Sequence, residues 1–573
     1  MSDGLTIGLA QLDPKVGDLA GNLRLIGEAR ARAAAAGCDL VIASELVVAG
    51  YPPEDLVMKP IFLDAVADAV AKLARETASG PALLIGAPLR AEHAKELRRA
   101  QGAGEGAGNG RPVNAALLLD GGKVAAVSAK HDLPNYGVFD EKRVFAPGPL
   151  PEPVEFRGVR LGVLVCEDMW TAAPARFLRD RGAEILVVIN GSPFETDKQG
   201  ERLKLARARV RETGCAVVYV NQVGGQDELV FDGASFVLDA EGREVARLSA
   251  FTPDFATLRL ARKDNAVAVE GGSLAPALDP LAAIYQAMML GLRDYVNKNG
   301  FPGVLLGLSG GIDSAISAVV AADALGPDRV HCVMMPSPYT SRESLDDAAA
   351  LARNMGLRLD TIAIQPAMDA FGAMLKDVFA GKAADTTEEN IQARARGITL
   401  MAMSNKFGHM VLSTGNKSEM SVGYATLYGD MCGGYSVLKD VYKTTVYALS
   451  NWRNANVPVG GLGAAGAVIP SNIITRPPTA ELKPNQTDQD SLPPYDVLDD
   501  ILSRLIEGEM AISDIVARGH DRATVMRVWR MVNIAEYKRR QAPPGVKITR
   551  RSFGRDRRYP ITNGFSGARP DQA

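Results

Sequence analysis

The segment 307–314, with the sequence GLSGGIDS, contains the residue types that bind phosphate groups. The apolar run 303–306 before it is typical of a buried strand, and the run of small and apolar residues 315–322 after it is typical of a buried helix. In a strand, turn and helix of this kind, backbone N–H groups and the positive end of the helix converge on an anion. The segment therefore predicts a phosphate-binding loop.

This loop differs from a Walker A motif, because no Gly-Lys-Ser/Thr sequence closes it and it supplies no lysine for a β- or γ-phosphate. Its polar side chains are the hydroxyls of Ser309 and Ser314 and the carboxylate of Asp313. A carboxylate beside bound phosphates indicates a divalent cation between them, and Mg²⁺ is held in this way in nucleotide sites. The strand-like run 411–414 leads into a second turn of this type, in which Glu419 offers a second carboxylate.

Three reactive side chains follow strand-like runs in the first half of the chain. Glu45 follows the run 40–44, Lys130 follows 123–129 and Cys166 follows 161–165. Taken singly, a Glu or Lys at a strand end is more often a solvated surface residue. A thiol, however, needs a base to become a nucleophile, and a tetrahedral oxyanion needs a positive donor. The three together therefore suggest covalent catalysis at a carbonyl group.

The surrounding elements predict two α/β domains. Short apolar runs alternate with helical stretches from about residue 5 to residue 260, a pattern typical of a layered α/β domain. After the phosphate loop, the runs 330–335, 344–355 and 358–364 follow a βαβα order, which predicts a parallel sheet with a ligand at the carboxyl ends of its strands. We expect domains at 1–262 and 279–573 with a linker at 263–278, and a surface loop at 90–111.

The SGGIDS sequence resembles the pyrophosphate loop of the ATP pyrophosphatase family, whose members adenylate a carboxyl or carbonyl group and let a nitrogen or sulfur nucleophile displace AMP. The resemblance implies ATP as a substrate, with Mg²⁺ beside it. It assigns to ATP the residues Leu308, Ser309, Gly310, Gly311, Ile312, Asp313, Ser314 and Thr414. The loop alone identifies the half-reaction and not the product.

Four segments between residues 44 and 194 resemble the nitrilase superfamily, whose Glu-Lys-Cys triad hydrolyses amides. They are SELVVAGYPPEDL, KHDLPNYGVFDEKRVF, GVLVCEDMW and NGSPF. The resemblance covers about residues 5–255 and implies an αββα sandwich. It makes Glu45 the general base, Lys130 the group that stabilises the tetrahedral intermediate, and Cys166 the nucleophile. In nitrilase-type glutaminases, the matching positions that contact glutamine are Tyr136, Ser192 and Lys198, and a second glutamate beside the triad matches Glu141.

Four segments between residues 424 and 495 are similar to segments of NAD synthetases. They are YATLYGD, LKDVYK, PPTAEL and DQDSLPPY, and the resemblance extends from about residue 279 to residue 563. This resemblance implies a Rossmann-like, doubly wound parallel sheet. Lys483 stands where the family usually has arginine, which weakens any bidentate contact there. Asp313 and Glu419 are the expected metal ligands. We expect deamido-NAD to contact Asn390, Arg394, Glu419, Tyr424 and Lys538, of which Lys538 resembles the family's C-terminal lysine.

Composition excludes several other classes of protein. The chain has 573 residues, 47% of them hydrophobic, and a net charge of −3, as expected of a globular protein with two to four domains. No apolar run reaches 18 residues and the first residues lack a signal peptide's pattern, so we expect a cytoplasmic protein without a membrane partner. The five cysteines are scattered, which argues against disulfides or a zinc site.

Together, the two resemblances imply an enzyme that uses ATP and glutamine to amidate deamido-NAD, with NAD, AMP, pyrophosphate and glutamate as products. We expect small-molecule substrates, no nucleic acid, and a homo-oligomer, which the family resemblance suggests is an octamer. Two alternatives stay open. One is an amidase with a regulatory nucleotide-binding domain. The other is a nucleic-acid-modifying enzyme, for which the nine Lys and Arg residues between 537 and 558 are the support.

Overall fold

The computed structural model describes residues 4–100, 110–263, 266–484 and 486–565, and it divides into two compact units, Met1–Leu278 and Asp279–Ala573. Each unit contains its own sheets and its own buried core. Residues 266–270, inside the predicted linker, pair with the edge of a sheet in the first unit. The domain boundaries 1–262 and 279–573 stay a prediction. In the described part of the chain, no helix is long and apolar enough to cross a membrane.

Two sheets form the middle of the first unit. The larger has the order β15-β14-β1-β2-β3-β4-β5, and the smaller has the order β13-β12-β9-β8-β7-β6. Their strands are β1 (Gly4–Gln11), β2 (Leu40–Ile42), β3 (Ala82–Leu89), β4 (Val113–Asp120), β5 (Lys123–Ala129), β6 (Val154–Phe156), β7 (Val159–Val165), β8 (Ile185–Asn190), β9 (Ala216–Asn221), β12 (Phe236–Leu238), β13 (Glu244–Arg247), β14 (Asp254–Lys263) and β15 (Ala266–Glu270), and a separate hairpin joins β10 (Val223–Gln226) to β11 (Leu229–Asp232).

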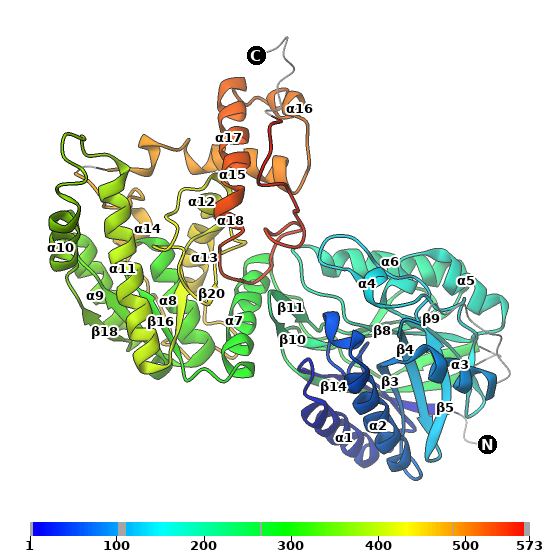
Figure 1. The fold of residues 1–573 in the computed structure, drawn as a ribbon. Coiled ribbons are helices and arrows are strands. Elements are labelled where there is room, and N and C mark those ends of the chain that lie inside the picture. Colours follow the sequence, from blue (N-terminus) through cyan, green and yellow to red (C-terminus); the bar gives the residue numbers. More distant parts are fainter. Residues whose placement is uncertain (1–3, 101–109, 264–265, 485, 566–573) are drawn as a thin grey trace. The chain divides into compact units, whose positions relative to one another are not determined.

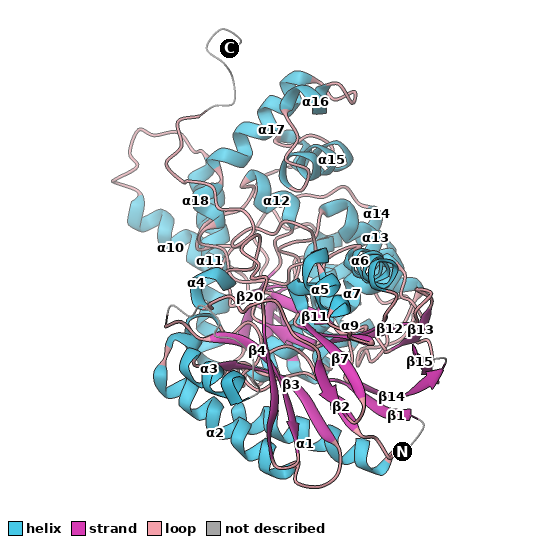
Figure 2. Ribbon diagram, turned by 90° about the vertical axis from the view of Figure 1, so that its right-hand side faces the viewer, coloured by secondary structure: helices cyan, strands magenta, loops and turns pink. Residues whose placement is uncertain are grey.

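Helices cover the outer face of each sheet. Figure 2 shows α1 (Leu19–Ala35) and α2 (Pro60–Glu76) along one side of β1 to β4. The smaller sheet packs against α5 (Ala172–Asp180) and α6 (Lys198–Thr213). A buried cluster joins the inner faces of the two sheets, with Leu9 and Leu84 from one and Val163 and Val187 from the other. The predicted αββα sandwich is therefore confirmed.

The remaining helices of this unit are short. They are η1 (Glu54–Met58), α3 (Ala91–Ala100), α4 (Glu141–Val144) and η2 (Cys166–Met169). The prediction of a loop over 90–111 is wrong for its first part, because α3 forms there, and its glycine-rich centre at 101–109 lies outside the described residues. Glu92, Lys95 and the other residues of α3 favour a helix over a loop.

The second unit is built on one five-stranded sheet in which every neighbouring pair of strands is parallel. Its order is β18-β17-β16-β19-β20, so the chain first adds strands on one side of β16 and then on the other. The strands are β16 (Val304–Gly307), β17 (Val330–Met334), β18 (Arg358–Thr361), β19 (Met410–Ser413) and β20 (Tyr435–Ser436). A crevice at the carboxyl ends of β16 and β19 is expected where the strand order reverses.

Right-handed crossovers that run in opposite directions from β16 place helices on both faces of this sheet. Figure 1 shows α8, α11 and α13 around the strands. The doubly wound fold predicted from the sequence is confirmed. The helices of the unit are α7 (Pro280–Lys298), α8 (Ile312–Leu325), η3 (Pro327–Arg329), α9 (Arg342–Met355), α10 (Gln365–Leu375), α11 (Thr386–Phe407), α12 (Lys417–Val422), α13 (Lys443–Ala455), α14 (Ser471–Thr475), η4 (Asp488–Asp490), α15 (Tyr495–Ile506), α16 (Ile512–Val516), α17 (Arg522–Ile534) and α18 (Glu536–Arg539).

Candidate active sites

Glu45, Lys130 and Cys166 meet in the first unit, although they come from three separate strands. Lys130 directly follows β5, Cys166 directly follows β7, and Glu45 lies three residues after β2. The ammonium group of Lys130 donates to Oε1 of Glu45 at 2.7 Å and to Oε1 of Glu141 at 2.8 Å. All four side chains are buried. The sequence prediction that these residues share one site agrees with this geometry.

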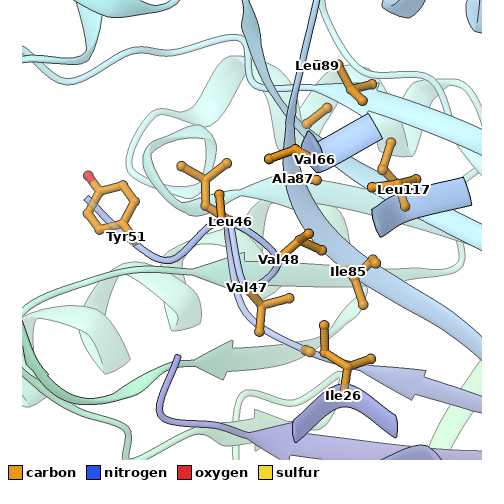
Figure 3. Close-up of a cluster of buried hydrophobic side chains, with 14 of the residues drawn as sticks. Ile26, Leu46, Val47, Val48, Tyr51, Val66, Ile85, Ala87, Leu89 and Leu117 are labelled. Atoms are coloured by element: carbon orange, nitrogen blue, oxygen red, sulfur yellow. The ribbon is translucent and has the colours of Figure 1, made fainter. Parts of the chain in front are cut away.

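The carboxylate of Glu45 is held by more than its lysine. The side-chain amide of Asn114 donates to Oε1 at 2.7 Å, and the backbone N–H of Gly191 donates to Oε2 at 2.8 Å. A Cβ atom at Gly191 would stand 2.9 Å from the Tyr51 ring, so a side chain there would displace this donor. The next residues, Leu46 to Val48, are fully buried and pack against α1, α2, β3 and β4 (Figure 3). Glu45 is therefore rigidly oriented.

Burial and neighbouring charges set the protonation states of the triad. Burial by itself lowers the pKa of Lys130, but the carboxylates of Glu141 and Glu45 outweigh it and raise that pKa well above its usual value. Burial, reinforced by the charge of Glu45, raises the pKa of the Cys166 thiol well above its usual value. Lysine therefore stays charged and cysteine stays protonated at neutral pH, so the thiol needs a base at the moment of attack.

The fourth buried group, Glu141, has an intermediate character. Burial raises its pKa to about 7, against the lowering effect of Lys130. Its Oε1 also accepts a hydrogen bond from the Tyr51 hydroxyl at 2.9 Å. Glu141 therefore titrates near neutral pH while it orients the lysine.

Asp168 joins the turn at Cys166 to the segment that follows Lys130, and the sequence analysis did not identify it. Its Oδ1 accepts from the backbone N–H groups of His131 at 3.0 Å and Asp132 at 2.8 Å, and its Oδ2 accepts from Val165 N at 3.0 Å. Cys166 has a φ of 48°, an uncommon conformation that this contact helps to hold. The only sequence signal that could have identified Asp168 is its position two residues after Cys166.

Two of the residues assigned to glutamine lie around Glu167, the residue that follows Cys166. The Tyr136 hydroxyl donates to both carboxylate oxygens of Glu167, each at 3.1 Å. The Lys198 ammonium lies 4.3 Å from the centre of the Trp170 ring and 3.2 Å from Glu201. Burial raises the pKa of Glu167, and the Lys198 charge is among the effects that oppose the shift. The residue after Cys166 is thus a carboxylate whose pKa is affected by the Lys198 ammonium.

Ser192, the third of these residues, is held from behind by Arg202. The fully buried Arg202 donates from Nε to Ser192 Oγ at 3.1 Å and from Nη2 to the carbonyls of Ser192 and Pro193 at 2.9 and 2.8 Å. Its Nη1 contacts both oxygens of Asp232 at 2.8 Å. The sequence analysis missed Arg202, although it stands one helical turn after Lys198.

In the second unit, a cavity of about 290 Å³ lies at the carboxyl ends of the parallel strands. Most of the residues assigned to ATP line it, namely Leu308, Ser309, Gly311, Ile312, Asp313, Ser314 and Thr414, whereas Gly310 does not. Gly310 has a φ of +83°, and a Cβ atom there would come within 2.3 Å of the Ser344 carbonyl oxygen. Only glycine therefore fits this turn.

The loop is shaped by its own serines. Ser314 Oγ accepts from Ser309 N at 3.2 Å and donates to the Gly311 carbonyl at 3.0 Å, while Gly311 N donates to Ser309 Oγ at 3.2 Å. Helix α8 begins at Ile312, and its N-cap residue, Gly311, has no side chain to cap the first turn. The first N–H groups of α8 are therefore suited to an anion.

Asp313 and Glu419 converge on the ammonium group of Lys443. Lys443 Nζ donates to Asp313 Oδ2 and, at 3.1 Å, to Glu419 Oε1, and Asn416 Nδ2 donates to Asp313 Oδ1 at 2.9 Å. Burial raises the pKa of Glu419 to about 8, although Lys443 opposes the shift. Among the described residues, no group of three or more His, Cys, Asp or Glu side chains is arranged to hold a metal ion. A metal here would need oxygen ligands from its substrate or from water.

Not every residue assigned to deamido-NAD reaches this cavity. Glu419 and Tyr424 line it, whereas Asn390, Arg394 and Lys538 are absent from its lining. Helix α11 instead presents Ala393, Arg396, Gly397 and Leu400 to the cavity. Asn390 Oδ1 accepts from Thr426 Oγ1 at 2.9 Å, Arg394 donates to the Leu427 carbonyl at 3.2 Å, and Lys538 donates to the carbonyls of Gly423 and Ala425, both at 2.7 Å. All three contact the 423–427 loop, and their role with substrate stays a prediction.

The C-terminal basic residues are largely paired inside the second unit. Arg539 and Arg557 both contact Glu536, and Lys547 lies 2.9 Å from Asp556. Arg539 also donates to the carbonyl of Ser421 in α12 at 2.6 Å. These charges fasten the tail to the unit and leave fewer of them for an external partner.

Comparisons with known proteins match two families in different parts of the chain. Residues 6–266 match the carbon-nitrogen hydrolase family, and residues 284–542 match the NAD synthase family. A glutamine-dependent NAD(+) synthetase from Rhodobacter capsulatus is 50% identical over 98% of this chain and 99% of its own length. The corresponding protein of Xanthomonas campestris is 47% identical over 98% of both chains.

A solved structure extends the likeness to three dimensions. The glutamine-dependent NAD+ synthetase from Acinetobacter baumannii, in complex with adenosine diphosphate, is 42% identical and has a TM-score of 0.76, with 98% of this chain and 99% of that chain covered. Because these matches cover 98% of this chain, they include both of its units. The chain belongs to the glutamine-dependent NAD(+) synthetase family.

Proposed function

We propose that this protein amidates the nicotinate carboxylate of deamido-NAD with ammonia drawn from glutamine, at the expense of ATP. The observation that carries the proposal is the presence of two built sites in one chain: a buried Glu45–Lys130–Cys166 cluster, and a phosphate loop at the switch point of a parallel sheet. The products are NAD, AMP, pyrophosphate and glutamate. Each site accounts for one half of this chemistry.

In the glutaminase half, the sulfur of Cys166 attacks the amide carbon of glutamine while its proton passes to Glu45. Lys130, which stays charged, donates to the oxyanion that forms. Collapse of the tetrahedral intermediate breaks the C–N bond, and the proton held by Glu45 leaves with the ammonia. Water then hydrolyses the thioester to give glutamate and to return the thiol.

The rim of this site has charges that match the two ends of free glutamine. Glu167, which follows the nucleophile and accepts from Tyr136, suits the α-ammonium group. Lys198 suits the α-carboxylate, and Ser192 Oγ, which accepts from Arg202, has its own proton left to donate. We therefore assign Tyr136, Ser192 and Lys198 to glutamine, with Glu167 as an added member.

In the synthetase half, a carboxylate oxygen of deamido-NAD attacks the α-phosphorus of ATP, and pyrophosphate leaves. Ammonia then attacks the acyl carbon of the adenylate, AMP leaves, and the amide results. Backbone N–H groups of the 308–314 loop and the start of α8 suit phosphate, and Thr414 lines the same cavity just after β19, the strand that pairs with β16. Glu419, Tyr424, Asn390, Arg394 and Lys538 remain assigned to deamido-NAD.

Mg²⁺ fits the paired carboxylates of Asp313 and Glu419, because both already contact one cationic group, the Lys443 ammonium. The two carboxylates are its protein ligands in this proposal. When bound, the ion neutralises charge on the pyrophosphate group. Hard oxygen ligands of this type suit Mg²⁺.

Fusion of the two activities has a chemical reason. Free ammonia is mostly ammonium at neutral pH, and ammonium is not nucleophilic. An enclosed passage that delivers ammonia between the sites would keep it unprotonated. We retain this passage, and an oligomer as large as an octamer, as parts of the proposal.

One assay separates this function from its rivals. Release of pyrophosphate from ATP is measured with deamido-NAD and separately with RNA, and with either glutamine or ammonium as the nitrogen source. We expect release with deamido-NAD and NAD formation from both nitrogen sources. Release dependent on RNA would favour a nucleic-acid-modifying enzyme, and glutamine hydrolysis without any pyrophosphate release would favour an amidase with a regulatory domain.

A further inference from the structure

The phosphate loop contains no lysine, so the charge of a bound triphosphate must be met from elsewhere in the cavity. In the described part of the chain, three cationic side chains line the cavity: Arg396, Lys443 and Arg476. Lys443 is engaged by the carboxylates of Asp313 and Glu419. Arg396 donates from Nε to the Met335 carbonyl at 3.1 Å, beyond the end of β17. Arg476 is the one whose printed contact is with the backbone of the loop.

Arg476 contacts the loop through Gly310. Its Nη2 donates to the Gly310 carbonyl oxygen at 3.0 Å. Across a trans peptide bond, the C=O of one residue and the N–H of the next point in opposite directions. By holding the Gly310 carbonyl, Arg476 therefore turns the Gly311 N–H toward Ser309 and the interior of the loop, where it donates to Ser309 Oγ.

The other terminal nitrogen of Arg476 can donate a hydrogen bond to a ligand. Nη1 is buried and has no hydrogen-bond partner within the described residues. Its nearest carboxylate oxygen, Oδ2 of Asp347, is 4.0 Å away and already accepts from Asn472 Nδ2 at 2.6 Å. A buried guanidinium N–H without an acceptor is costly, which favours an acceptor supplied by the substrate.

We propose that Arg476 binds the β- and γ-phosphates of ATP and the pyrophosphate that leaves. This inference rests on the proposed function, and it supplies the loop with the cation that its sequence lacks. A guanidinium group forms strong charge-assisted hydrogen bonds with phosphate oxygens. The adenylate and AMP lack the β- and γ-phosphates, so Arg476 discriminates between the two products of the first step.

The test measures the binding of Mg²⁺-pyrophosphate, ATP and AMP to the full chain by calorimetry. For Arg476→Gln we expect the dissociation constants of pyrophosphate and ATP to rise about 10- to 100-fold, while that of AMP stays unchanged. The dissociation constants of Arg476→Lys should lie between those of the wild type and those of Arg476→Gln, because lysine keeps the charge but loses the planar fork. Arg342→Gln is the matched control, since Arg342 is an exposed arginine on α9 that pairs with Asp346.

Thermal melting of each variant shows whether the fold is intact, and Arg476→Lys carries the test if Arg476→Gln is unstable. Pyrophosphate affinity equal to that of the wild type, or an equal loss for AMP and pyrophosphate, would overturn the inference. If the wild-type chain itself bound neither ATP nor pyrophosphate, the proposed function would fail together with it. Wild-type binding that survives in Arg476→Gln would remove this inference alone.

Discussion

Lys130 is a buried cation whose charge is balanced by two buried carboxylates, those of Glu45 and Glu141. A buried ion pair contributes little net stability, but loss of one partner leaves a costly unpaired charge. The cluster of one positive and two negative charges can accept one more proton. Glu141 is the carboxylate that accepts it, because its pKa is raised to about 7.

Glu141→Gln should change the pH dependence of glutamine hydrolysis. In the wild type, Glu141 is charged above pH 7 and protonated below it, so kcat/KM should fall as the pH drops through about 7. An amide does not titrate, so the variant should lose this acid limb and show a lower plateau. Glutaminase rates between pH 5.5 and 9 test this, and an unchanged acid limb in the variant would assign the titration to another group.

The carboxylates of Asp313 and Glu419 support a second test. Asp313→Ala or Glu419→Ala should abolish AMP formation, because each removes a predicted ligand of Mg²⁺ and a partner of Lys443. Glutamine hydrolysis in the first unit should remain measurable. Both products are quantified in one reaction, over a range of Mg²⁺ concentrations. Unchanged NAD synthesis by Asp313→Ala would end the magnesium proposal.

At the scale of elements, the position of a residue on its helix decided its contacts. Asn390 and Arg394 are four positions apart and were expected to face the substrate together. They do share a face of α11, but that face contacts the 426–427 segment, and the face with Arg396 and Gly397 lines the cavity. A periodic pattern indicates which residues lie together and not what they face.

Arg202 links helix α6 to the turn that carries Ser192 and to Asp232 of the β10–β11 hairpin. Arg202→Met should lower the free energy of unfolding by about 3–5 kcal/mol, since it leaves the buried Asp232 unpaired. It should also raise the KM for glutamine more than it lowers kcat, while ammonium-supported synthesis is unaffected. Thermal melting and steady-state kinetics measure the two effects.

Two further variants separate structure from positioning at this arginine. Arg202→Met with Asp232→Asn should recover part of the stability, because no unpaired charge remains, yet keep the high KM. Arg202→Lys should restore stability better than the KM, because lysine cannot contact Ser192 and Asp232 in the same fork. A KM that follows stability in every variant would leave Arg202 with a structural role only.

At the scale of the whole molecule, the two units should be separable by chemistry. Cys166→Ala removes the proposed nucleophile of the first unit, so glutamine-supported NAD synthesis should fall by several powers of ten, to about the limit of detection. High concentrations of ammonium salt should still yield NAD, because the cavity of the second unit is untouched. Cys38→Ala is the control, since that buried thiol lies outside the triad and should leave both activities in place.

Glu45→Ala and Lys130→Ala should behave as Cys166→Ala does. If all three variants lost NAD synthesis from glutamine and from ammonium, with unchanged thermal melting, the first unit would not be a separable ammonia donor. Retention of glutamine-supported synthesis in Cys166→Ala would assign the nucleophile to another residue. Measurement of NAD with each nitrogen source distinguishes these outcomes.

The sequence by itself determined the two α/β folds and predicted the phosphate loop and the triad, because each depends on residues that are close in the chain or on strand ends that a sheet aligns. Only the tertiary structure decided which partners hold them. Asn114 and Gly191 at Glu45, Arg202 behind Ser192, and Lys443 between two carboxylates are contacts across long sequence distances. Arg476 and Gly310 are 166 positions apart. Such contacts follow from how elements pack in space, and local residue patterns carry no record of them.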